Sequence, residues 1–256
     1  MNQVKLSPIA VPKTSEVLAS ELRRQIMSSG LPTGAPLPTE RDLIAQTGLS
    51  RSSVREALKI LAAENLITTR PGRFGGTATS RPDDESLGRS ISLFVHGRGI
   101  TLAALLQARE AIEPPLAALA ATSRTEEELK TLVQVTQKVE DAVDDLPTFL
   151  HENVNWHIAI AAASHNELLR AFMSASAKLI YKATSIDNFT TPDVRSQVIQ
   201  AHRRILKAIV EQDADAARRR MARHLAATTA AMRELADAPL EFDLQPSKAR
   251  REPRRS

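Results

Sequence analysis

The sequence predicts a mostly α-helical protein, with a winged helix-turn-helix domain at its N-terminal end and an all-helical bundle behind it. Two observations predict this fold class. Apolar residues recur at helical spacing along most of the 256 residues. Short β-like segments occur at 66–69 and 77–79, on either side of a glycine-rich turn at 71–76.

The first segment has the order of elements of a winged helix-turn-helix. Ser15, Thr39 and Ser50 each precede an apolar-periodic run and are suitable helix N-caps. The predicted elements, in chain order, are helix 15–29, helix 39–46, a turn at 47–49, helix 50–64 and the hairpin 66–79.

The second part of the chain is rich in Ala, Leu and charged residues and contains no glycine after Gly99, which favours a helical bundle. Pro114 falls inside a helical pattern and is expected to kink that helix. The predicted helices cover 87–96, 101–122, 125–144, 147–163, 166–187, 194–211 and 213–236. The predicted domain map is a flexible arm at 1–14, the winged domain at 15–79, a linker at 80–86, the helical effector-binding domain at 87–237 and a disordered basic tail at 238–256.

Composition and charge restrict the function classes. The chain has no cysteine, which excludes disulfides and thiolate metal sites. Nothing resembles a secretory signal, and no apolar run approaches the roughly 20 residues that span a bilayer, so we expect a cytoplasmic location and no membrane partner. Residues 1–80 hold 10 Lys/Arg against 6 Asp/Glu, whereas residues 81–240 hold 19 against 21. A basic first segment on a slightly acidic body suits an anion-binding module.

The helix predicted at 50–64 has the features of a DNA recognition helix, which presents polar and basic side chains from its first turns to the major groove. Arg51 and Arg55 are four residues apart and share one face, and an arginine can grip guanine O6 and N7 with two hydrogen bonds. Isolated arginines on an exposed helix are usually only solvated, but here the capped helix, the turn and the hairpin agree with DNA binding. The expected DNA-contacting residues are Arg41, Ser50, Arg51, Ser52, Ser53, Arg55 and, at the wing, Gly72 and Arg73.

The motifs of this segment are similar to those of the GntR family of bacterial transcription regulators. They are Pro36-Leu-Pro-Thr-Glu-Arg-Asp-Leu43, Gly48-Leu-Ser-Arg-Ser-Ser-Val-Arg-Glu-Ala-Leu58 and Leu66-Ile-Thr-Thr-Arg-Pro-Gly72. The resemblance implies that Arg41, Arg51, Arg55 and Gly72 contact DNA. The wing sequence Arg73-Phe-Gly-Gly76 is longer than the common glycine-rich tip of the family.

Three histidines, His157, His202 and His224, lie on separate predicted helices, and Asn153 precedes His157 by about one helical turn. Three imidazoles and an amide oxygen inside a bundle are a plausible site for a divalent ion such as Zn²⁺, Ni²⁺ or Mn²⁺. Spacing alone indicates this weakly, because histidines far apart in a sequence usually only cap helices or pack.

From about residue 87 to 235 the chain resembles the FCD effector-binding domain of the FadR-type subgroup. The resemblance implies that Asn153, His157, His202 and His224 are metal ligands, with Asn153 where aspartate is usual. It also implies that Arg109 binds an effector carboxylate, the alternative being an ion pair with Glu113. The motifs that carry it are Leu105-Leu-Gln-Ala-Arg-Glu-Ala-Ile-Glu113, Ala117–Ala121, Asn155-Trp-His157, Ser164-His-Asn-Glu-Leu-Leu169, Ala201-His-Arg-Arg-Ile-Leu-Lys-Ala208 and Met221-Ala-Arg-His-Leu225.

These features predict a ligand-responsive regulator, expected to be a repressor. It would bind a pseudo-palindromic double-stranded DNA operator as a homodimer, and a small carboxylate effector at a divalent metal would control its DNA affinity. Three alternatives stay open: a metal-free regulator of a bulkier ligand such as an acyl-CoA, a DNA-binding protein without an effector, and a metal-dependent enzyme. The chain has no His-Glu-x-x-His motif, phosphate-binding glycine loop or cysteine nucleophile, which disfavours the enzyme.

Overall fold

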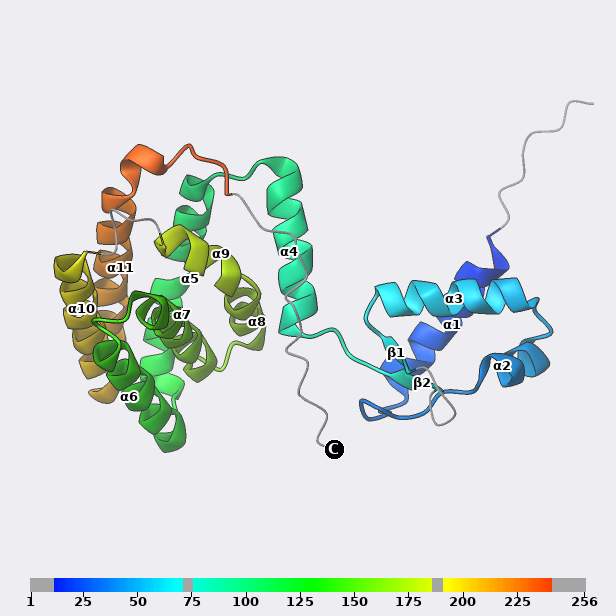
Figure 1. Ribbon diagram of the computed structural model, residues 1–256. Coiled ribbons are helices and arrows are strands. Elements are labelled where there is room, and N and C mark those ends of the chain that lie inside the picture. Colours follow the sequence, from blue (N-terminus) through cyan, green and yellow to red (C-terminus); the bar gives the residue numbers. More distant parts are fainter. Residues whose placement is uncertain (1–11, 71–75, 186–190, 241–256) are drawn as a thin grey trace, which may run out of the picture. The chain divides into compact units, whose positions relative to one another are not determined.

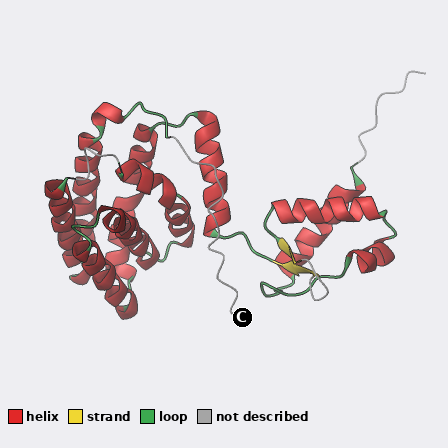
Figure 2. Cartoon of the chain, in the orientation of Figure 1, coloured by secondary structure: helices red, strands yellow, loops and turns green. Residues whose placement is uncertain are grey.

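The computed structural model describes residues 12–70, 76–185 and 191–240. The chain divides into two compact units, residues 1–83 and residues 84–256 (Figure 1). Among the described residues helices dominate and the two strands form one small hairpin, which Figure 2 shows in yellow. The predicted fold class is therefore confirmed. The wing residues Gly72 and Arg73, arm residues 1–11 and tail residues 241–256 lie outside the described ranges.

The N-terminal unit is three helices and a hairpin. The strands pair antiparallel, with Ile67 opposite Thr79. A bridge between Pro36 and Ala78 adds the extended segment before the second helix to this hairpin. The elements are α1 Thr14–Ser28, α2 Glu40–Thr47, α3 Arg51–Ala63, β1 Ile67–Arg70 and β2 Gly76–Thr79.

The turn between α2 and α3 is built from helix-end residues that the sequence indicated. Thr39 and Asp42 form a reciprocal capping box at the start of α2. Gly48 ends α2 at a φ of 68°, a left-handed conformation in which glycine avoids the strain of a side chain. The Ser50 side chain then accepts a hydrogen bond from the backbone N–H of Ser53 and caps α3. These caps fix where the recognition helix begins.

The predicted cap at Ser15 is wrong by about two residues. The helix α1 begins at Thr14, because the carbonyl of Lys13 already accepts the backbone N–H of Val17 at 3.1 Å. Ser15 is buried inside the first turn. In the core of this unit, α1 packs against α3 through apolar side chains that include Leu18, Leu22, Ile26, Val54, Leu58 and Leu61.

The C-terminal unit is a bundle in which α5 packs along α11, α6 along α7, α10 along α11 and α4 along α8 (Figure 1). Its core consists of buried apolar side chains, mainly Ala, Leu and Ile, on the inward faces of these helices. The elements are α4 Asp84–Arg98, α5 Leu102–Ser123, α6 Glu126–Asp141, α7 Leu146–Ala163, α8 Glu167–Ala175, α9 Ala177–Thr184, α10 Pro192–Val210, α11 Ala214–Ala231 and the 3-10 turn η2 Arg233–Leu235.

Two predicted boundaries are corrected in this unit. The helix α4 begins at Asp84, so residues 84–86 of the predicted linker are helical, and the carboxylates of Asp84 and Glu85 favour the N-terminal end of the helix dipole. The helix predicted at 166–187 is two helices that meet at Ser176. The break lets α8 pack on α4 while α9 packs on α5 and α7.

The start of α5 holds a piece of the predicted tail. The backbone N–H of Leu102 donates to the carbonyl of Ala238 at 3.0 Å, and the N–H of Leu240 donates to the carbonyl of Ile100 at 3.1 Å. Leu240 is buried in the core, which explains why residues 238–240 are ordered. The helix α5 continues through Pro114, so the kink expected there stays a prediction.

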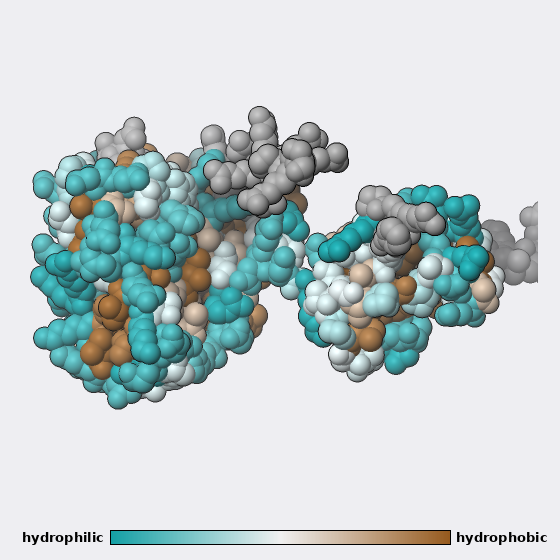
Figure 3. Space-filling view, turned by 60° about the horizontal axis from the view of Figure 1, so that its bottom comes forward, coloured by the Kyte–Doolittle hydropathy of each residue, from teal (hydrophilic) through white to brown (hydrophobic). Residues whose placement is uncertain are grey.

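The outer surface of both units is mainly hydrophilic on the face in Figure 3, where hydrophobic side chains gather in a few patches. None of the helices in the described ranges is long and apolar enough to cross a membrane.

Candidate DNA-binding surface and metal-effector pocket

The helix α3, predicted to be the recognition helix, presents its arginines to solvent. Arg51 and Arg55 are exposed on the same face, and the carboxylate of Glu40 lies between them, at 4.0 Å from the Nε atom of Arg51 and 3.9 Å from that of Arg55. Arg41 on α2 is also exposed. Exposed pairs at such distances stabilise a protein by only about 0–1 kcal/mol, so these guanidinium groups can exchange Glu40 for another anion.

The serines at the start of α3 are partly engaged within the protein. The hydroxyl of Ser50 lies 2.9 Å from that of Ser52 and 3.0 Å from that of Ser53. The Thr14 hydroxyl donates to Ser53 at 3.0 Å and ties the start of α3 to α1. Ser50 and Ser53 therefore hold the helix start in place, while Ser52 is exposed on the helix. The DNA contacts predicted for all three serines stay predictions.

Three histidines from three helices meet in the second unit. The structure places His157 of α7, His202 of α10 and His224 of α11 so that one ring nitrogen of each lies within 4.8 Å of the others. The ring centroids are 5.0–5.5 Å apart, and all three side chains are buried. This arrangement provides three nitrogen ligands for one metal ion.

Arg109 and Glu113 of α5 lie against the two ring nitrogens of His157. Arg109 Nε donates to Glu113 Oε1 at 2.6 Å, and Arg109 Nη2 lies 3.2 Å from His157 Nε2. Because a guanidinium only donates, His157 Nε2 must accept and its ring proton must be on Nδ1. That Nδ1 atom lies 2.5 Å from Glu113 Oε2, although it is not aligned as a hydrogen bond. A carboxylate at Nδ1 is the usual support of a metal-binding histidine.

Burial keeps the histidines neutral, which is the state that binds metals. Desolvation lowers the pKa of His224 to about 3, with further lowering by His157 and Arg109. Desolvation also lowers the pKa of His202 well below its ordinary value and lowers that of His157. Burial opposes ionisation of Glu113, but Arg109 and His157 outweigh it and hold the Glu113 pKa at about 2.

Several buried atoms of the cluster lack a hydrogen-bond partner within the described ranges. They include Oδ1 of Asn153 and both ring nitrogens of His202. Leaving a buried acceptor without a partner costs about 1–3 kcal/mol, so such atoms call for a ligand. Asn153 lies one turn before His157 on α7 and lines the same pocket. The amide oxygen and the three imidazoles therefore fit a divalent metal ion.

Trp156 packs against one candidate ligand and fixes the plane of its ring, a role that sequence reasoning missed. Its indole stacks on the His202 imidazole, with centroids 3.6 Å apart and planes 2° from parallel. The indole N–H donates to the Thr136 hydroxyl at 2.9 Å, and that hydroxyl donates to the carbonyl of Leu132 at 2.7 Å. This is the only tryptophan in the chain, but its place against His202 depends on the packing of α7 with α10.

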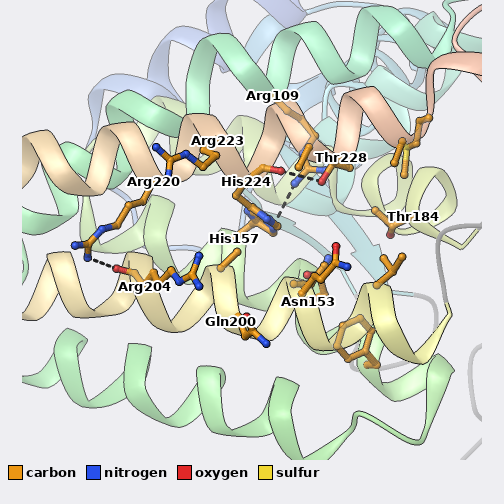
Figure 4. Close-up of a pocket in the computed structure, with 18 of the residues that line it drawn as sticks. Arg109, Asn153, His157, Thr184, Gln200, Arg204, Arg220, Arg223, His224 and Thr228 are labelled. Atoms are coloured by element: carbon orange, nitrogen blue, oxygen red, sulfur yellow. Dashed lines mark hydrogen bonds between the residues drawn. The ribbon is translucent and has the colours of Figure 1, made fainter.

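The histidine cluster borders a pocket of about 360 Å³ between α5, α7, α10 and α11 (Figure 4). Arg109, His157 and His224 line it, with apolar residues such as Phe149 and Val198. Sequence reasoning singled out Arg109 but missed Arg204, Arg220 and Arg223, which also line the pocket. Helical spacing could have found two of these. Arg220 precedes His224 by one helical turn, and Arg223 follows Arg220 by three residues.

Two matches with known families agree with these two sites. Residues 14–75 match the family described as bacterial regulatory proteins, gntR family, and residues 104–227 match the FCD domain. The fold and these family matches define a DNA-binding transcription regulator with a helical FCD domain. The chain belongs to the GntR family.

Individual relatives support this assignment over most of the chain. The Glc operon transcriptional activator of Escherichia coli K12 is 31% identical over 206 residues, which cover 77% of this chain and 80% of the relative. The putative L-lactate dehydrogenase operon regulatory protein of the same strain is 30% identical over 228 residues. This match covers 85% of this chain and 86% of the relative. The solved structure of a Streptococcus agalactiae GntR protein covers 83% of this chain and 97% of its own, with a TM-score of 0.65 and 29% identity.

Proposed function

We propose that this protein is a repressor that binds a pseudo-palindromic operator as a homodimer, and that a small organic acid bound at a divalent metal ion in the FCD domain controls its DNA affinity. Its place of action would then be the cytoplasm. The observation that carries the proposal is the cluster of three buried, neutral histidines beside a pocket that contains a buried arginine.

In this proposal Asn153, His157, His202 and His224 hold the metal, Zn²⁺, Ni²⁺ or Mn²⁺. The ion would supply Lewis-acid coordination for the carboxylate and hydroxyl or keto oxygens of the acid. Asn153 has no negative charge, so the ligand set is neutral and should bind metal more weakly than a set with aspartate. A neutral set also leaves more positive charge at the metal to attract an anionic effector.

Arg109 is proposed to bind the effector carboxylate. The guanidinium has five N–H donors. Glu113 uses one, and the donor that faces His157 Nε2 would become free for a carboxylate once a metal takes that nitrogen. It lines the pocket although only 4% of the residue is exposed. The ion pair with Glu113, weighed as the alternative to effector binding, is present, and it leaves donors for a carboxylate.

The switch requires that the acid binds one conformation of the domain better than another. The pocket lies between α5, α7, α10 and α11, so an acid that bridges these helices changes the free energy of their packing. In the proposed dimer this change re-aims the two recognition helices relative to the half-sites of the operator. By linkage, the acid must then lower operator affinity by the same factor as the operator lowers acid affinity.

Metal analysis and calorimetry test the metal and the acid together. We expect the protein purified without chelator to contain close to one divalent metal per chain. Stripping the metal with a chelator should abolish binding of 2-hydroxy acids such as lactate, and adding Zn²⁺, Ni²⁺ or Mn²⁺ should restore it. Trp156 fluorescence should change on metal addition because the indole stacks on His202.

A matched pair of variants makes the result specific. His202→Ala should lose metal and acid binding together, whereas His96→Ala, an exposed histidine on α4, should bind both like the wild type. Acid binding that survives complete removal of metal would favour the metal-free alternative and refute this proposal. A DNA mobility-shift titration with lactate then shows whether the acid releases the operator, as expected of a repressor, or strengthens binding.

A further inference from the structure

The pocket has an arginine-lined end that the metal and Arg109 do not explain. Arg204 of α10 and Arg220 and Arg223 of α11 line it, at the end toward the loop that joins the two helices. Figure 4 shows these side chains together on one side of His224, with Arg109 and Asn153 on the other. No Asp or Glu lines the pocket within the described residues.

The helix geometry makes this end part of the same cavity as the metal site. On α11, Arg220, Arg223, His224 and Thr228 recur at helical spacing and form one face. Arg220 precedes His224 by four residues, which is roughly 6 Å along the helix axis. On α10, Arg204 lies about one turn after Gln200 and Ala201, which line the same pocket. A ligand held at the histidines can therefore reach the arginines if its chain is a few carbon atoms long.

Within the described residues, no carboxylate neutralises the charge of this end. Arg220 donates to the backbone carbonyl of Arg204 at 2.5 Å, which brings α10 and α11 together but cancels no charge. Among the described residues, Arg204, Arg220 and Arg223 form no ion pair with a carboxylate. Their neighbour Arg203 points elsewhere and pairs with Glu140. Several like charges beside a partly enclosed cavity attract a counter-charge from solution.

We propose that the natural effector carries two anionic groups, a 2-hydroxy acid head at the metal and Arg109, and a second carboxylate at Arg204, Arg220 and Arg223. This inference rests on the proposed function, because the head group binds at the site described there. The pocket of about 360 Å³ is at the lower end of the range for small-molecule sites, which suits a diacid better than a bulky conjugate. The remaining pocket wall near Phe149 and Val198 is apolar and would contact the carbon chain.

Matched acids with the same head group test the second anion. Calorimetry compares malate, 2-hydroxyglutarate and 2-hydroxyadipate with 2-hydroxybutyrate, 2-hydroxypentanoate and 2-hydroxyhexanoate, which replace the distal carboxylate by a methyl group. We expect at least one diacid to bind roughly ten- to a hundredfold more tightly than its partner, the range of one or two charge-assisted hydrogen bonds. The length series also shows which spacing fits.

The variants assign this preference to the arginines. The double variant Arg220→Gln, Arg223→Gln should reduce the preference to near one, because diacid affinity falls much more than monoacid affinity. The control Arg218→Gln, Arg219→Gln removes equal charge from exposed positions of α11 that do not line the pocket, and should keep the preference.

The outcomes separate the two proposals. Equal binding of diacids and monoacids would overturn the second anion while the metal-acid site stands. A preference that survives in the double variant, or that is lost equally in the control, would overturn the role of these arginines. If no acid of either series binds the metal-loaded wild type, the proposed function and this inference fail together.

Discussion

Arg51 and Arg55 are the residues on which sequence-specific binding should depend. Each is exposed and held only loosely near Glu40. A good bidentate arginine–guanine contact discriminates against a wrong base by about 1–3 kcal/mol. Arg51→Ala or Arg55→Ala should therefore abolish specific binding while the circular dichroism melting curve is unchanged. The measurement is a mobility-shift or footprinting titration of the operator at fixed salt concentration.

Lys59→Ala is the matched control for these two variants. Lys59 is exposed on α3 and pairs only with Glu56, at 3.6 Å and three residues away. The variant should keep the operator preference. A normal footprint for either arginine variant would argue strongly against α3 as the recognition helix.

Glu113, behind the histidine cluster, should contribute strongly to the stability of the fold. Its carboxylate is buried between Arg109 and His157. Removing one partner of a buried pair typically costs 3–5 kcal/mol, because the other charge stays buried without compensation. Glu113→Gln should lower the free energy of unfolding by about that much in urea denaturation. Glu85→Gln, which breaks the exposed pair with Arg89, should change it by less than about 1 kcal/mol. Equal effects would contradict the assigned burial.

At the residue scale, the sequence predicted which histidines come together but not the side chains that support them. The sequence could single out His157, His202 and His224 as candidate metal ligands for two reasons. They lie on separate predicted helices, and they match ligand positions of the family that the chain resembles. The stacking of Trp156 on His202 and the contact of Glu113 with His157 depend on how three helices pack. Spacing in one sequence does not determine that packing, so these roles were missed.

At the scale of elements, the contact of α4 with α8 depends on a glycine. A Cβ at Gly88 would lie 2.9 Å from the backbone carbonyl oxygen of Ala175, and backbone cannot move aside cheaply. Gly88→Ala should therefore separate the two helices or strain them, at a cost of about 1–3 kcal/mol. Chemical denaturation monitored by circular dichroism measures the change in the free energy of unfolding.

Gly97→Ala is a control in the same helix with the opposite expected sign. Nothing lies within 4 Å of a Cβ placed there, and alanine is the better helix former. Stability should rise by about 0.5–1 kcal/mol. If Gly88→Ala also stabilised the protein, the close approach of α4 to α8 would be wrong.

Helix positions were more predictable than helix ends in this chain. Apolar periodicity placed the helical regions of the bundle, although it joined α8 and α9 into one helix. The break at Ser176 and the start of α4 at Asp84 were missed, since each depends on where a neighbouring helix offers a surface. Residues 238–240 were predicted to belong to the disordered tail for the same reason. Their order depends on the packing of one buried leucine, Leu240, in the core.

At the scale of the whole molecule, the buried histidines link folding stability to pH. In the unfolded chain they titrate near their ordinary pKa of 6.5, but in the fold His224 has a pKa of about 3, and the pKa values of His157 and His202 are also lowered. Below pH 6.5 the unfolded state therefore binds more protons than the folded state. The free energy of unfolding of the metal-free protein should decrease as the pH falls from about 6.5, by about 1.4 kcal/mol per pH unit for each proton taken up.

Glu113 adds a second, more acidic component, because its folded pKa of about 2 is below the ordinary 4.5. The stability that it contributes is present above pH 4.5 and is lost as the pH falls toward 2, so it does not affect the slope between pH 5 and 7. Urea denaturation at pH 5, 6, 7 and 8 with a chelator present measures that slope. His224→Gln should reduce it by about one proton, whereas His96→Gln should not, because His96 is exposed. An unchanged slope in His224→Gln would show that His224 is not buried in the neutral form, and the metal site would then lose one of its ligands.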